Sequence, residues 1–155
     1  QINSGNSPIA QYILPKRPLR LYVGTDNEKV PMFVGMLQKI PQYDEAGTAN
    51  WSALDFLSEI AETDLRATLK MRDVTDVVIA KILEQYGMTS QQYQLSRGQN
   101  LIPFVLFKKG ENTGNILRKL VQAENGALWL DEQGIVRFTT RAGVLDKQPV
   151  MRQAR

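Results

Sequence analysis

The stretch TDVVIAKILEQYG, residues 75–87, carries apolar side chains at helical spacing. They recur at i, i+1, i+4, i+5 and i+8, which predicts an amphipathic helix that packs one face into a core; they are Val78, Ile79, Ile82, Leu83 and Tyr86. Asp73 or Thr75 can cap its start, and Gly87 is a typical residue to end it. The fold therefore contains at least one packed helix.

A second stripe of the same kind follows at a constant offset of 38 residues, as from Thr75 to Thr113. Its apolar members are Ile116, Leu117, Leu120 and Val121. Thr113 can cap this helix and Gly126 can end it. The equal offset fits an internal duplication, but it also fits two unrelated amphipathic helices, and the sequence leaves both interpretations open.

Extended segments precede the helices. LRLYVG (19–24) alternates, TDNEK supplies turn residues, and VPMFVGMLQKIPQ (30–42) is apolar on both faces up to Leu37, so we expect a hairpin whose second strand is covered on two sides. Gly35 in mid-strand predicts a bulge or a close backbone approach, and with it a curved, barrel-like sheet. Residues 51–55 can return as a strand before a short helical turn, although 52–63 could also form one helix.

The remaining segments complete a mixed order. YQLS and LIPFVLFK are expected to be extended, with Pro103 placing the second at an edge or in a connector. ALWLDEQGIVRFTTR (127–141) predicts a hairpin with DEQG at its tip. We therefore expect an α+β fold: hairpins forming part of a barrel-like sheet in residues 1–64, a two-helix α/β portion ending in a hairpin over 65–141, and a tail or linker at 142–155.

The composition argues against most catalytic chemistry. The 155 residues include no Cys and no His, so thiolate, Ser/His and His-metal sites are excluded. Asp55 and Glu59 lie four residues apart and could be imagined as a glycosidase pair, but no supporting motif accompanies them. We expect no enzyme, no cofactor and no metal. No apolar run approaches the roughly 20 residues of a spanning helix, so no membrane partner is expected. Because the chain begins at Gln1, we expect a processed product or a piece of a longer polypeptide.

Charge is distributed unevenly around a net value of +3. Every charged residue between positions 41 and 64 is acidic, whereas both flanking regions are basic overall. This segment is either a solvated face or one half of an assembly surface. The candidate assembly surface comprises Asp55, Leu57, Glu59, Ile60, Glu62 and Asp64 with the bases Lys16, Arg17 and Arg20. The pI of 9.2 and the clusters PKRPLR and FKKG keep a basic nucleic-acid-binding module as the alternative function.

Several spacings carry a family resemblance. They are F-x-G-x-x-x-x-I (Phe33, Gly35, Ile40), a return strand ending in Asp before an apolar turn (51–57), T-x-x-x-I-x-x-I-L-x-x-Y-G (75–87), and T-x-x-x-L-x-x-L followed by G-A-x-x-x-x-x-x-G-x-x-x-F (113–138). Together they resemble the tail or baseplate hub proteins of tailed bacteriophages and related contractile injection systems, over about residues 20–141.

The resemblance implies a structural role in the virion tail, assembled in the host cytoplasm. Such proteins form trimeric rings that continue the bore of the tail tube and connect it to the tip or spike. The implied partners are other copies of the chain and other tail tube, tip or spike proteins. Specific nucleic-acid binding is not expected of a hub, because a DNA conduit needs a bore that does not grip phosphates.

Overall fold

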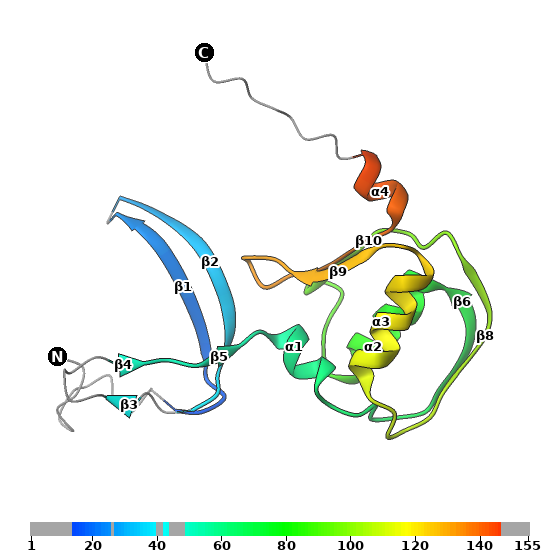
Figure 1. The fold of residues 1–155 in the computed structure, drawn as a ribbon, viewed down its shortest axis with the longest axis horizontal. Helices are drawn as coiled ribbons and strands as arrows, with labels where there is room; N and C mark the ends of the chain where they lie inside the picture. The colour runs from blue at the N-terminus through cyan, green and yellow to red at the C-terminus, as the bar shows by residue number, and fades with distance from the viewer. Residues whose placement is uncertain (1–13, 26, 40–41, 44–48, 147–155) are drawn as a thin grey trace, which may run out of the picture. The chain divides into compact units, whose positions relative to one another are not determined.

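The computed structural model describes residues 14–25, 27–39, 42–43 and 49–146. The described chain divides into two compact units, each considered by itself below (Figure 1). The first contains the described residues up to Glu59 together with 130–134, and the second contains 60–129 and the described residues from 135 onward. Strands and helices occur together, which confirms the predicted α+β class.

The first unit is built on one long hairpin. Strands β1 (Pro18–Thr25) and β2 (Glu28–Leu37) pair antiparallel, and the short β5 (Ala53–Leu54) joins the far end of β2. A separate two-stranded ladder is formed by β3 (Gln42–Tyr43) and β4 (Ala49–Asn50). The three-stranded sheet is open, and the described residues close no barrel.

Two irregularities shape this hairpin. Leu21 faces Phe33 whereas Tyr22 faces Pro31, so Met32 is an extra residue and forms a bulge. At Gly35 an added Cβ would lie 2.6 Å from the carbonyl oxygen of β5 and 2.5 Å from the Phe33 ring. Glycine at position 35 therefore marks a close backbone approach, one of the two roles predicted for it, and the bulge lies three positions earlier.

Helix α1 (Phe56–Ala61) follows β5 directly. Asp55 precedes its first residue and acts as the N-cap: the Ser58 backbone N–H donates to Asp55 Oδ1 at 2.7 Å, and the Ser58 hydroxyl donates to Oδ2 at 2.8 Å. Of the two sequence interpretations, a strand followed by a short helix is confirmed, because β5 ends at Leu54 and Asp55 then starts the helix; the strand covers only residues 53–54 of the predicted 51–55.

The second unit contains both predicted helices, α2 (Thr75–Gln85) and α3 (Thr113–Ala123), and a short α4 (Arg141–Asp146). Strands β6 (Leu69–Val74) and β8 (Leu101–Phe107) pair antiparallel. A second sheet has the order β7–β10–β9, with β7 (Tyr93–Leu95) parallel to β10 (Val136–Thr139) and β9 (Ala127–Leu130) on the other side. Helices α2 and α3 lie inside the curve of β6 and β8 (Figure 1).

The predicted helical stripes form the core of this unit. The side chains exposed by 5 % or less include Val78, Ile79, Ile82, Leu83, Ile116, Leu117, Leu120, Val136 and Phe138. These residues come from both helices and from β10, so burial of their apolar surface is what holds helices and sheet together.

The two helices are linked reciprocally at their ends. The hydroxyl of Thr75, which begins α2, donates to Glu124 Oε1 at 2.7 Å, and Glu124 follows the end of α3. The hydroxyl of Thr113, which begins α3, bonds to the phenol of Tyr86, which follows the end of α2. Both threonines are fully buried. The helices therefore run antiparallel, each tied to the other at both ends.

The offset of 38 residues also relates Tyr86 to Glu124, but it does not extend to the strands. Strand β6 ends directly before α2, whereas residues 108–112 separate β8 from α3. The equal spacing is thus a property of the helix pair, and duplication of a larger unit remains a hypothesis.

Candidate assembly surface

The most exposed apolar side chains of the first unit gather toward the turn of the β1–β2 hairpin. The exposed fractions are 51 % for Leu21, 57 % for Val23, 50 % for Val30 and 56 % for Met32, with Tyr22 at 47 %. Monomeric proteins rarely leave large apolar side chains clustered in water without a functional reason. We call residues 21–25 and 27–32 the apolar arm.

Both faces of the apolar arm carry exposed side chains. Val23 lies opposite Val30 on one face, and Tyr22 lies opposite Pro31 on the other. Strand β5 pairs only with Met36 and Leu37, so the described residues leave the arm two-stranded, with backbone groups unpaired along its outer edges.

The sequence prediction of a strand covered on two sides is therefore wrong for the first part of β2. Burial begins only near its end, at Gly35 and Leu37. Apolar side chains on both faces of a strand predict burial of both faces, but the folded chain does not bury those of the arm.

The predicted basic half of the surface lies at the base of the same hairpin. Lys16, Arg17 and Arg20 are all exposed. The Lys16 backbone N–H donates to the Leu37 carbonyl at 2.7 Å, and the Leu37 N–H donates to the Arg17 carbonyl at 2.9 Å. These backbone bonds fix the chain at positions 16 and 17 while leaving the cationic side chains free for solvent or a partner.

The residues of the predicted acidic half differ in their exposure to solvent. Asp55 is half-buried and serves as the α1 cap, and Leu57 is half-buried. Glu59 is half-buried as well, and its Oε2 is buried without a hydrogen-bond partner among the described residues. Glu62 and Asp64 are exposed and are the two carboxylates of this set that can meet a partner without rearrangement. The acidic residues 44 and 45 lie outside the described residues.

Ile60 requires a correction. It is 2 % exposed and belongs to the core of the second unit, so it cannot supply binding energy to a surface of the folded chain. The prediction that Leu57 and Ile60 both lie on the assembly surface is therefore wrong for Ile60, whose side chain points inward.

The candidate residues divide between the two units. Lys16, Arg17 and Arg20 belong to the first, and Glu62 and Asp64 belong to the second. Sequence reasoning missed the apolar arm itself. A signal for the arm was available in the hairpin pattern. Apolar residues occupy both faces of its strands, and few segments next to the hairpin in the sequence are available to cover both faces.

Two polar networks in the second unit have a structural explanation. Burial raises the pKa of Glu124, but the bonds donated by Thr75 and by the backbone N–H groups of Asn100 and Gln99, at 2.7, 2.9 and 3.2 Å, outweigh burial and hold the pKa below its ordinary value. This carboxylate ties residues 99–100 to both helices.

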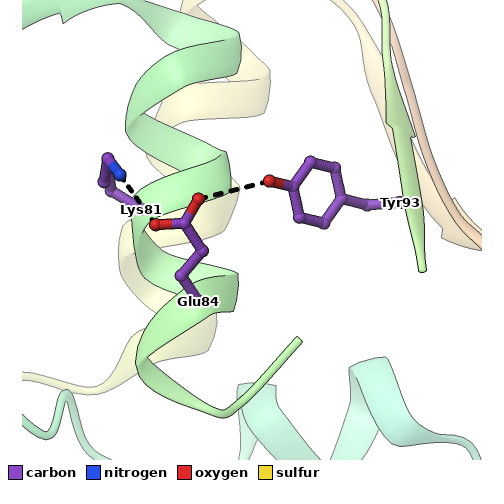
Figure 2. A network of polar contacts seen from close by, with 3 residues as sticks. All are labelled: Lys81, Glu84 and Tyr93. Carbon is purple, nitrogen blue, oxygen red and sulfur yellow. Dashed lines mark hydrogen bonds and ion pairs between the residues drawn. The ribbon is translucent and has the colours of Figure 1, made fainter. Parts of the chain in front are cut away.

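The second network lies on the surface of α2 (Figure 2). Lys81 Nζ lies 2.7 Å from Glu84 Oε2, and the Tyr93 hydroxyl donates to Glu84 Oε1 at 3.3 Å. The hydrogen bond raises the pKa of Lys81 and lowers that of Glu84, whereas burial raises the pKa of Tyr93. The exposed Lys81 neutralises the charge of the Glu84 carboxylate, and the Tyr93 hydrogen bond connects β7 to α2. The arrangement does not resemble a general acid and base pair.

The part of the chain that the structure describes contains no group of three or more His, Cys, Asp or Glu side chains placed to hold a metal ion. Within that part, no helix combines the length and hydropathy that a membrane span needs. Comparison with protein-family models gave no match, and comparison with curated proteins gave no significant relative.

Proposed function

We propose that this chain is a structural building block of a phage tail or baseplate hub, a protein that associates with copies of itself into a ring linking the tail tube to the tip. The observation that carries the proposal is the apolar arm. A two-stranded ribbon with large apolar side chains on both faces and open edges is marginally stable alone and gains stability when another sheet covers it.

The arm favours assembly over catalysis for an energetic reason. Covering Leu21, Val23, Val30 and Met32 would remove apolar surface from water. This burial stabilises the assembly by roughly 25 cal/mol for each Å² of apolar surface removed. A heterologous contact between neighbouring copies can repeat this burial around a ring, since each copy offers one patch and receives another. The helix and hairpin spacings that resemble tail hub proteins support the more specific assignment.

Complementary charges on the two units can orient one copy against the next. Exposed Glu62 and Asp64 oppose in sign the exposed Lys16, Arg17 and Arg20. Exposed pairs contribute only about 0 to 1 kcal/mol each and are screened by salt, so they are suited to set register and association rate while the arm supplies the binding energy.

The mass of the purified chain across a concentration series, with electron microscopy of the assemblies, tests the proposal. We expect a concentration-dependent oligomer, a trimer in the full-length protein, that encloses an open bore. The test variant is Val23→Lys with Val30→Glu, which removes the exposed apolar pair but keeps an attractive cross-strand pair so that the hairpin still folds.

A matched control places one charge at the turn of the same hairpin. Thr25 lies opposite Glu28, so Thr25→Lys adds a cross-strand ion pair without removing apolar surface. We expect the control to assemble like the parent and the test variant to remain monomeric with an unchanged circular dichroism spectrum. A parent that stays monomeric at every concentration, or a test variant that assembles normally, would contradict the proposal.

A further inference from the structure

The β6–β8 ribbon of the second unit has one buried and one exposed face. Met71 and Val105 lie opposite each other on the inner face, where Val105 is 3 % exposed. Lys70 and Leu106 lie opposite each other on the outer face, and both are exposed. The outer face therefore combines apolar and basic side chains at neighbouring positions.

A bulge extends this arrangement along the ribbon. Met71 faces Val105 and Asp73 faces Ile102. Arg72 between them therefore faces two residues of β8, Pro103 and Phe104, and the extra residue forms the bulge. Counting from the inward-facing Val105, Phe104 shares the outer face with Leu106. Strand β6 thus supplies a basic column to this face, and β8 supplies an apolar one.

The apolar column of β8 is strongly exposed. The fractions are 54 % for Leu101, 59 % for Phe104 and 45 % for Leu106. Among the described residues the ribbon contains only β6 and β8, so β8 has an outer edge with no neighbouring strand. An exposed apolar edge of this kind is a template for pairing with another extended segment.

The neighbouring charges identify the chemistry of that segment. Lys70, Arg72, Lys108 and Lys109 are exposed, and none of their side chains forms an ion pair with a described carboxylate. Four unpaired cations around an apolar edge favour a partner that brings carboxylates, because opposite charges steer association and fix register.

We propose that the outer edge of β8 binds an extended, acidic segment of another protein by strand addition. The partner's backbone pairs with β8, its apolar side chains cover Leu101, Phe104 and Leu106, and its carboxylates face Lys70 and Arg72. The site lies in the second unit and does not depend on the apolar arm or on ring formation.

The edge fits a peptide better than a nucleic acid. Single-stranded nucleic acids are held by aromatic side chains on which successive bases stack, and this face offers one aromatic residue between two leucines. Among the described residues β8 has no neighbour on its outer edge, so its backbone groups there can pair with a peptide backbone at every position except Pro103, which has no N–H to donate. A second copy of this chain fits less well, because its described strands contain few acidic residues and none alternates carboxylates with apolar side chains.

The experiment selects peptides from a displayed library of short random sequences, using the full chain as the target. The test variant is Lys70→Glu with Arg72→Glu. The matched control, Arg118→Glu with Lys119→Glu, makes the same change of charge at exposed positions of α3. Amide NMR spectra of the full chain then show which backbone groups each selected peptide perturbs.

We expect the selected peptides to alternate apolar residues with Asp or Glu and to perturb the amides of β8. Their affinity should fall roughly tenfold in the test variant and stay close to that of the parent in the control. Phe104→Ser should weaken the same peptides.

Four results would overturn the proposal. They are selected peptides without acidic bias, equal loss of affinity in the test and control variants, tighter binding of a single-stranded oligothymidylate than of any selected peptide at β8, and self-association of the chain that buries β8 before a peptide can bind.

Discussion

Replacing Glu124 by alanine should lower the free energy of unfolding by about 2 to 4 kcal/mol. The carboxylate accepts bonds from the Thr75 hydroxyl and the backbone N–H groups of Gln99 and Asn100. Thr75 is fully buried, so its hydroxyl loses its partner with no water to replace it, at about 1 to 3 kcal/mol. Gln99 and Asn100 are exposed, so water can replace those two bonds at a smaller cost.

The effect should depend on pH in a defined direction. The pKa of Glu124 is lower in the folded chain than its ordinary value of 4.5, so its stabilising contribution is complete above that value and is lost as the pH falls through the folded pKa. The difference in stability between parent and Glu124→Ala should therefore be largest near neutral pH and should shrink in acid.

Urea unfolding followed by circular dichroism, at several pH values, measures this effect. Thr75→Val and the double variant complete a thermodynamic cycle, whose coupling energy should be about 1 kcal/mol or more. Glu132→Ala at an exposed position is the control. A loss below about 0.5 kcal/mol for Glu124→Ala, or a loss that does not change between neutral and acid pH, would refute the reasoning.

Three further predictions concern the second unit. Leu83→Ala and Leu120→Ala, at positions exposed by 0 % and 4 %, should each cost about 2 to 5 kcal/mol in urea unfolding, and near-neutral values would mean that the helical stripes do not form a core. Gly98→Ala should lower the melting temperature, because its Cβ would lie 2.9 Å from the Thr75 backbone nitrogen; an unchanged value would show that the loop shifts freely. Lys81→Met should leave the melting temperature unchanged at low and high salt, and a salt-dependent loss would contradict this.

The elements with strong local signals were predictable. The stripe of Val78, Ile79, Ile82 and Leu83 predicted α2, and the same spacing predicted α3, because an amphipathic pattern of this length specifies both a helix and its buried face. The hairpin tip was also predictable: Gln133 N–H donates to Asp131 Oδ1 at 3.0 Å and Gly134 has φ 86°, as expected for a DEQG turn.

The candidate surface was predicted only in part. The charged residues Lys16, Arg17, Glu62 and Asp64 are exposed, as a partner surface requires. The error was Ile60, since the apolar spacing on a helix of one and a half turns cannot say whether a side chain meets its own core or a partner. Whether these residues form an interface remains a prediction.

By itself, the sequence determined the local structure of this protein. Residues 75–87 and 113–126 specify helices, and residues 19–37 specify a hairpin, because periodicity and turns act between positions close along the chain. The predicted N-caps were wrong: no side chain caps α2 at Val74, and Asn112 rather than Thr113 caps α3. Only the tertiary structure decided which apolar residues are covered. Burial depends on segments distant in sequence: α2, α3 and β10 cover one another, whereas the described chain leaves half or more of Val23, Val30 and Phe104 exposed. The same kind of apolar residue therefore forms a core in one place and an open surface in another.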